Sequence, residues 1–193
     1  MRPENEGRAV LAILKSPERD YNANSISKVL GITPMGALKL LKRLEKEGIL
    51  EPRKVSNIIF YRLNSRNPYA LDYASFMLRR EAEHSPAYVK RWVSELRKIK
   101  RAEVAVLFGS VLRSGAKARD IDALFVLRGG IGAVQKEIDK VNAVNDRKIH
   151  PLFQSRADLA GNIQRRDPAI LNAVKGVVAF GEKEFASLLG GAP

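Results

Sequence analysis

Cysteine is absent from the 193-residue chain, and histidine occurs only at positions 84 and 150. Disulfides and thiolate metal sites are therefore excluded, and two histidines do not predict a structural zinc site. No apolar run approaches the roughly 20 residues that a membrane-spanning helix needs. The first ten residues, MRPENEGRAV, lack the apolar core of a signal peptide. We therefore expect a cytoplasmic protein without a membrane partner.

Acidic residues are scarce relative to basic ones. Asp and Glu number 21 against 34 Lys and Arg, which gives a formal net charge of +13. Most of this excess lies in residues 1–101. A basic surface attracts polyanions, nucleic acid above all, because binding releases their counterions. The alternative is that the charge serves solubility alone.

Residues 1–65 carry a pattern of helices followed by a hairpin. The expected elements are helices over residues 7–15, up to Leu30 and over 34–47, then strands over 50–54 and 58–63. Asn24 or Ser25 is the expected N-cap of the second helix, which ends at Gly31, and Thr33 is the expected N-cap of the third. This order of elements is typical of a winged helix-turn-helix.

The stretch SISKVLGITPMGALKLLKRLEKEGILEPRK resembles the winged-helix DNA-binding domains of bacterial and archaeal regulators. We expect its third helix to bury Ala37, Leu41 and Leu44, and the resemblance implies that its other face meets the major groove or flanking phosphate. The implied DNA-binding residues are the basic ones of that helix and of the wing: Lys39, Lys42, Arg43, Lys46, Arg53 and Lys54. The alternative is a solvated basic face on a domain that mediates protein contacts.

Residues 66–101 are expected to form a helical connector of two helices, which begin at Pro68 and at Ser85-Pro86. The second helix has apolar residues at helical spacing, namely Val89, Trp92, Val93 and Leu96, and should pack on the sheet of the C-terminal domain. The first carries apolar residues without an obvious partner, Tyr69, Tyr73 and Phe76, and could instead form a homodimer surface.

Residues 102–193 contain the stretch that says most about chemistry. An apolar run over residues 104–108 ends at Gly109-Ser110, and ten residues after Ser110 the sequence Asp120-Ile121-Asp122 opens a second apolar run. Both runs are predicted to be buried strands. Alternate residues of a strand share a face, so the two carboxylates lie side by side, an arrangement suited to Mg²⁺. Glycine permits a close backbone approach, and serine offers an N–H and a hydroxyl to phosphate.

This combination resembles the minimal nucleotidyltransferases of the DNA polymerase beta superfamily, over roughly residues 86–188. The resemblance implies that Gly109, Ser110 and Arg113 bind ATP or another nucleoside triphosphate. It also implies that Asp120 and Asp122 are catalytic and hold Mg²⁺ or Mn²⁺. The superfamily has a third acid on a later strand, and here the strand KIHPLFQ places His150 at about that position.

Several interpretations of His150 remain open. It could be the base for the incoming hydroxyl, since histidine accepts a proton near neutral pH, although it is a poorer Mg²⁺ ligand than a carboxylate. The enzyme could need only two aspartates, or the site could bind nucleotide without turnover. The plainest interpretation is a half-buried strand residue. Pro151 next to it indicates an edge or irregular strand.

The sequence thus predicts an α/β (α+β) protein with a winged helix-turn-helix domain (1–65), a helical connector (66–101) and a nucleotidyltransferase domain of sheet and helices (102–193). The first functional hypothesis is a metal-dependent enzyme that transfers a nucleoside monophosphate to a protein or nucleic-acid hydroxyl. The alternative is a transcriptional regulator or antitoxin whose nucleotidyltransferase-like domain binds nucleotide or a partner without turnover. The family resemblance makes a HEPN-type toxin a candidate partner.

Overall fold

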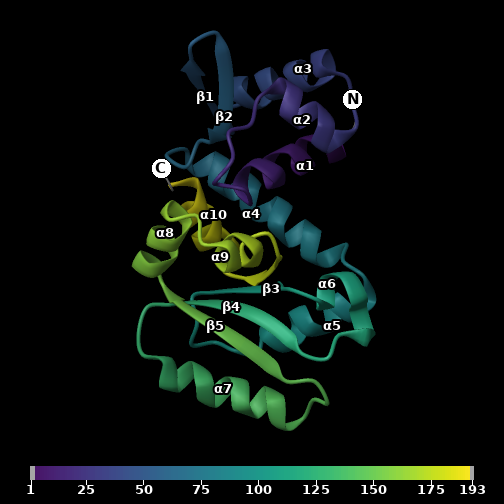
Figure 1. Ribbon diagram of the computed structural model, residues 1–193, viewed down its shortest axis with the longest axis vertical. Helices are drawn as coiled ribbons and strands as arrows, with labels where there is room; N and C mark the ends of the chain where they lie inside the picture. Colours follow the sequence, from purple (N-terminus) through teal and green to yellow (C-terminus); the bar gives the residue numbers. More distant parts are fainter. Residues whose placement is uncertain (1–2, 192–193) are drawn as a thin grey trace. The chain divides into compact units, whose positions relative to one another are not determined.

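The structure, a computed structural model, describes residues 3–191 and has a mixed α/β fold with two small sheets (Figure 1). The chain divides into two compact units. The first unit runs to Met77 and includes the stretch from Ala186 onward, and the second unit is Leu78–Phe185. The boundaries fall inside α4 (Pro68–Glu83) and α10 (Glu182–Gly190), so the helical range 66–101 is divided between the units.

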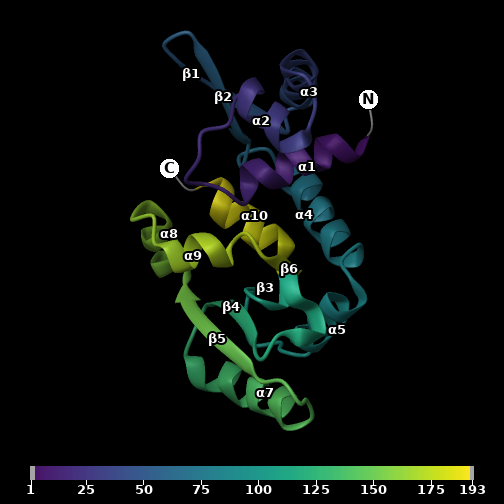
Figure 2. The same cartoon turned by 45° about the vertical axis from the view of Figure 1, so that its right-hand side comes forward.

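The first unit has the predicted order of helices and hairpin. Its elements before α4 are α1 (Pro3–Leu14), α2 (Ala23–Leu30), α3 (Pro34–Lys46), β1 (Leu50–Val55) and β2 (Ile58–Leu63). The antiparallel hairpin turns at Ser56-Asn57 and extends away from the helices (Figure 2). Its inner side is held by Tyr61, whose backbone N–H donates to the Tyr21 carbonyl at 2.8 Å.

The helix ends of the first unit follow local sequence chemistry. Thr33 caps α3 as predicted, since its side chain accepts from the Gly36 N–H, and Gly31 ends α2 with φ +67°. The predicted cap of α2 was wrong. Asn22 is the N-cap: its side chain accepts from the Ser25 N–H, and its own N–H donates to the Ser25 hydroxyl oxygen, so the helix begins earlier than expected.

Helix α3 buries one face against the rest of the first unit. The three predicted residues, Ala37, Leu41 and Leu44, are buried, and Leu40 joins them. A buried leucine of this kind contributes roughly 1.5–3 kcal/mol. The burial of this stripe fixes which side of α3 faces solvent.

The second unit is built on a four-stranded sheet of order β5-β4-β3-β6. Its strands are β3 (Val104–Phe108), β4 (Ile121–Leu127), β5 (Ile149–Ser155) and β6 (Val177–Phe180). Strand β3 is antiparallel to both neighbours, and β4 and β5 are parallel. Strand β5 is an edge strand, which confirms the expectation drawn from Pro151.

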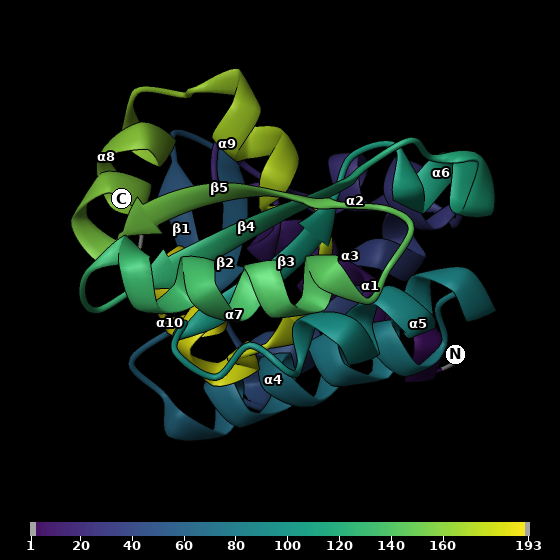
Figure 3. The ribbon, with the colours of Figure 1, turned by 90° about the horizontal axis from the view of Figure 1, so that it is seen from below.

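Helices cover both faces of this sheet (Figure 3). The helices are α5 (Ala87–Leu96), α6 (Val111–Ser114), α7 (Ile131–Ala143), α8 (Arg156–Gln164) and α9 (Pro168–Ala173), with a 3-10 turn at Gly115–Lys117. Helices α5 and α7 pack on one face, where Trp92 and Ile138 meet Ala105, Leu107 and Phe125. Helices α8 and α9 lie on the opposite face in Figure 1. Burial on both faces explains why β3 and β4 read as continuous apolar runs.

Two of the apolar residues of α4 stay on the surface. Tyr69 is 55% and Phe76 60% exposed, whereas Tyr73 packs within the first unit. Burial, followed by the nearby carboxylates of Glu6 and Glu47, raises the pKa of Tyr73 to about 12. Tyr73 therefore has a partner within the chain, contrary to the sequence-based expectation. Among the helices of residues 3–191, none is long and apolar enough to cross a bilayer.

Candidate functional site

The end of β3 approaches the start of β4 through a glycine bend. Gly109 has φ +80°, a conformation that L side chains rarely adopt. A Cβ at this position would overlap Oδ2 of Asp122 and lie 2.9 Å from its Cγ. The Asp122 carboxylate also accepts a hydrogen bond from the Ser110 backbone N–H. Glycine is thus required here because the aspartate packs directly on the bend.

Strand register brings the predicted acids and histidine to the same edge of the sheet. Phe108 is the ladder partner of Asp122, and Asp122 is the ladder partner of His150. Direct partners project from the same face, so Asp122 and His150 leave the sheet together. Asp120 lies 3.6 Å from His150, measured from Oδ2 to Nδ1. This distance is too long for a good hydrogen bond, and the His150 side chain is 62% exposed.

The pKa of Asp122 is raised by its surroundings at this edge of the sheet. Burial is the largest cause that raises its pKa above the usual range, and the neighbouring Asp120 carboxylate adds to it. His150 and the Ser110 N–H act in the opposite direction and lower it. The ionised Asp122 carboxylate is therefore held at a cost, and a cation placed between the two carboxylates would relieve it.

The donor set fits a hard cation that shares its ligands with a substrate. Within residues 3–191 no group of three or more His, Cys, Asp or Glu side chains is arranged to hold a metal ion. Mg²⁺ is commonly bound by one or two carboxylates together with substrate phosphates rather than by an all-protein cage. Asp120 and Asp122 meet that description, and His150 adds nitrogen, which Mg²⁺ disfavours.

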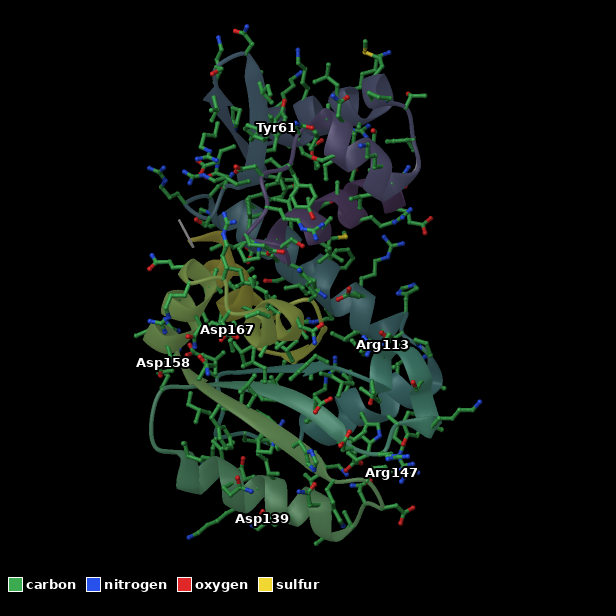
Figure 4. The ribbon with its side chains drawn as sticks, in the orientation of Figure 1. Tyr61, Arg113, Asp139, Arg147, Asp158 and Asp167 are labelled. Atoms are coloured by element: carbon green, nitrogen blue, oxygen red, sulfur yellow. The ribbon has the colours of Figure 1, made fainter. Side chains whose placement is uncertain are left out.

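Several exposed cationic residues lie close in the chain to the acid pair or to His150. Arg113 lies in α6, directly after the bend, and Lys117 and Arg119 lie between α6 and β4; all three are exposed. Arg147, which sequence reasoning missed, lies two residues before the start of β5 and is exposed as well. Figure 4 labels Arg113 and Arg147 at the side of the sheet where β4 and β5 begin. The only sequence signal for Arg147 was its place before the strand that carries His150.

The predicted DNA-binding residues of the first unit fall into two groups. Lys39, Lys42 and Lys46 are exposed at helical spacing on α3, and Lys54 is exposed on β1. Arg43 forms an ion pair with Glu6, and Arg53 pairs with Asp20 at 2.5 Å. The two arginines are therefore partly neutralised by carboxylates of the first unit, which leaves the lysines as the free cations of this set.

The far end of the sheet in the second unit holds a different arrangement. Glu103, whose side chain is only 4% exposed, pairs with Arg156 and, at 2.7 Å, with Arg128. The hydrogen bond from Arg156 is the largest cause that lowers the pKa of Glu103, to about 2. Burial opposes this shift, and the hydrogen bond from Arg128 adds to it. This pairing joins the ends of β4 and β5 to the start of β3. These ion pairs hold the strand ends together, and they lie at the end of β4 opposite to the acid pair.

Comparison with known proteins gives no match: no family model, no curated protein and no solved structure is similar to this chain at a significant level.

Proposed function

We propose that the second unit is a minimal nucleotidyltransferase of the DNA polymerase beta type, which transfers a nucleoside monophosphate from ATP or another triphosphate to a hydroxyl acceptor. The observation that carries the proposal is the contact of Asp122 with the Gly109-Ser110 bend. It supports a single ligand shared by the acids and the bend, because the two motifs lie in direct contact although they are separated in sequence.

The residues divide the work as follows. The Ser110 hydroxyl and the glycine bend seat the triphosphate, and Arg113 balances its charge. The acceptor oxygen attacks the α-phosphorus, the bond to the bridging oxygen of the β-phosphate breaks, and pyrophosphate leaves. The hydroxyl proton passes to His150 or to water. Mg²⁺ or Mn²⁺, when bound by Asp120 and Asp122, supplies charge neutralisation of the phosphates.

Label transfer tests this proposal. The full chain is incubated with α-labelled ATP, Mg²⁺ or Mn²⁺, and protein or oligonucleotide acceptors, and the reaction is repeated with Asp122→Asn. Asp139→Asn, on the exposed side of α7, is the matched control. We expect transfer by the wild type and the control, and loss of about 100-fold or more in Asp122→Asn. Equal label in all three proteins would exclude the acid pair from the reaction.

We propose further that the first unit is a winged helix that binds DNA through α3 and the hairpin. The exposed lysines at positions 39, 42 and 46 support it, because a basic helical face suits the major groove or its phosphates. A regulator or antitoxin that binds nucleotide without turnover is the second candidate function. The observation that favours it is the lack, within residues 3–191, of a third carboxylate beside the pair.

A gel shift on the gene's own promoter separates these candidates. A regulator predicts selective binding that changes when ATP and Mg²⁺ are added and that responds to Asp120→Ala only in their presence. If the protein is an enzyme that DNA merely recruits, its affinity for the promoter should not change when ATP is added. An antitoxin acting on a HEPN-type ribonuclease predicts suppression of that ribonuclease in a mixed assay. Failure to suppress any HEPN-type ribonuclease that a neighbouring gene encodes would remove this candidate.

A further inference from the structure

A cavity of about 410 Å³ opens in the second unit, at the end of β3 that is remote from the glycine bend. All of its lining residues belong to the second unit, and they come from α4, the end of α5, the loop before β3, the end of β6 and the start of α10. Phe180 lines the cavity and pairs with Ala105 near the start of β3. Asp122 pairs with Phe108 at the other end of that strand, so the cavity is separate from the acid pair.

The charged side chains of the cavity carry a net charge of +1. Three are cationic and two are acidic, namely Arg79, Arg97, Lys100, Glu83 and Glu182. Each carboxylate already has an arginine, since Glu182 accepts from Arg79 at 3.3 Å and Glu83 accepts from Arg97 at 3.2 Å. The ammonium group of Lys100 forms no hydrogen bond or ion pair with any of residues 3–191. One positive charge of the cavity is therefore left without a counter-charge.

Arg97 is held in place although part of its guanidinium is unused. Its Nε donates to the Ala179 carbonyl at 2.9 Å, and its Nη1 donates to Glu83. These two bonds fix the plane of the guanidinium, and they leave its Nη2 for another acceptor. Arg79 uses only its Nε, in the bond to Glu182. A guanidinium carries its N–H donors in a rigid fork, so both arginines keep donors that an anion can use with little loss of side-chain entropy.

The backbone around the cavity is fixed as well. The N–H groups of Lys100 and Arg101 both donate to one carboxylate oxygen of Glu137 in α7, at 2.7 Å and 3.0 Å. Gly181, directly after β6, packs so closely that a Cβ there would overlap the Glu103 carbonyl oxygen. Neither segment has to become ordered when a ligand binds. The cavity is therefore pre-formed, as most small-molecule sites are.

The remaining lining residues are apolar, namely Ile99, Ala102, Ala179 and Phe180. We propose that the cavity binds a small organic anion, whose carboxylate or phosphate group meets Lys100 and the unused arginine donors while its apolar body lies against these residues. Both anionic groups present oxygens that suit guanidinium and ammonium donors. An inorganic anion would leave the apolar wall in water, and a neutral ligand would leave the charge of Lys100 unbalanced. This site is additional to the transferase and DNA-binding functions and does not depend on them.

NMR titration of the full chain tests the site residue by residue. The probes are benzoate for the carboxylate and phenyl phosphate for the phosphate. Benzyl alcohol and inorganic phosphate serve as control probes, because each carries only one of the two features. Backbone amide shifts are followed at constant ionic strength, without nucleotide or metal. The variants are Lys100→Gln, Lys100→Arg and the matched control Arg101→Gln, since Arg101 is exposed and adjoins Lys100 but does not line the cavity.

We expect at least one aromatic anion to bind with a Kd on the order of 1 mM and to shift the amides of Ala102 and Phe180. Lys100→Gln should weaken binding about tenfold, because a hydrogen bond between charged groups is lost. Lys100→Arg and Arg101→Gln should stay within about twofold of the wild type, and both control probes should bind about tenfold more weakly. The aromatic anion that binds more tightly identifies the anionic group of the ligand.

Four results would overturn the proposal. The first is the absence of shifts around the cavity with either aromatic anion up to about 20 mM. The second is equal weakening by Lys100→Gln and Arg101→Gln, which would mean that only the general positive charge of the chain attracts the probes. The third is a set of shifts confined to Gly109 and Ser110, which would place the probes at the glycine bend. The fourth is binding of benzyl alcohol as tight as that of the anions.

Discussion

Gly109→Ala is the sharpest test of the contact between the bend and Asp122. The alanine Cβ would overlap Oδ2 of Asp122 and lie 2.9 Å from its Cγ and 3.1 Å from its Cβ. Because three atoms of one side chain are involved, turning the carboxylate alone does not relieve the overlap. The backbone at φ +80° adds strain of about 1–2 kcal/mol for any L residue.

The expected result is a large loss of activity with a modest loss of stability. A displacement of a catalytic group by about 1 Å can reduce a rate about 100-fold. The strain alone lowers Tm by about 2–4 °C for each kcal/mol in a chain of this size. Label transfer and thermal unfolding are measured on the same preparations.

Gly115→Ala is the matched control for this prediction. Gly115 also has positive φ (+52°), but a Cβ there meets nothing within 4 Å. It introduces backbone strain of its own and leaves Asp122 in place, so Tm should fall while transfer stays near that of the wild type. Normal transfer by Gly109→Ala, or equal inactivity of both variants, would refute the argument that the bend positions the aspartate.

Other consequences can be measured on single variants. Asp122→Asn should raise Tm in the absence of metal, because the raised pKa of Asp122 means that its ionised carboxylate opposes folding at neutral pH. Added Mn²⁺ should raise the Tm of the wild type but not of this variant. A lower Tm for Asp122→Asn than for the wild type would contradict this account. Glu103→Gln should be less stable than the wild type at pH 7, by about 2 kcal/mol because both arginines are largely solvated. Its pKa of about 2 lies below the usual 4.5, so its contribution is complete above pH 4.5 and is lost as the pH falls toward 2; urea midpoints of the two proteins should converge in that window. Lys39→Gln with Lys42→Gln should reduce the salt slope of DNA binding by about 1.8, whereas Arg43→Gln should chiefly lower stability because its guanidinium pairs with Glu6. A salt slope that depends on Arg43 as strongly as on the lysines would contradict the assignment of faces on α3.

The strands and most helices could be predicted because the spacing of apolar residues in the sequence follows from which side of each element is buried. Residues 104–108 were expected as a strand and form β3, and the hairpin of the first unit differs from expectation by one residue. Both faces of β3 and β4 are covered, which produces an unbroken apolar run that single-sequence patterns detect well. The caps at Thr33 and Gly31 were predictable because each acts through its own local chemistry.

Other features depend on partners distant in sequence and could not be predicted. The pairing of β6 with β3 as the fourth strand depends on the fold. The ion pairs of Arg43 and Arg53 with Glu6 and Asp20 join different elements, so sequence spacing gave no sign that these arginines are neutralised. The spacer after Ser110 contains α6 and a 3-10 turn, for which the sequence analysis made no prediction.

Most residues of the candidate site could be predicted from the sequence, but their arrangement in space could be predicted only in part. The spacing of Gly109, Ser110, Asp120 and Asp122 indicated their meeting, because two strands joined by a short connection pair with each other. His150 reaches the same level through the parallel ladder of β5, as expected from its place in the strand. Arg147 was missed, since a charged residue in a loop before a strand has no pattern of its own.

The ladder that aligns Phe108, Asp122 and His150 has a consequence for the durability of the site. The groups come from three strands that share one core, so no hinge or mobile flap needs to close for them to be assembled. Loss of the transfer activity proposed for the second unit should therefore coincide, during gradual denaturation, with deuterium uptake by the β3 and β4 amides. Solvent would enter the sheet and the candidate site in a single cooperative event.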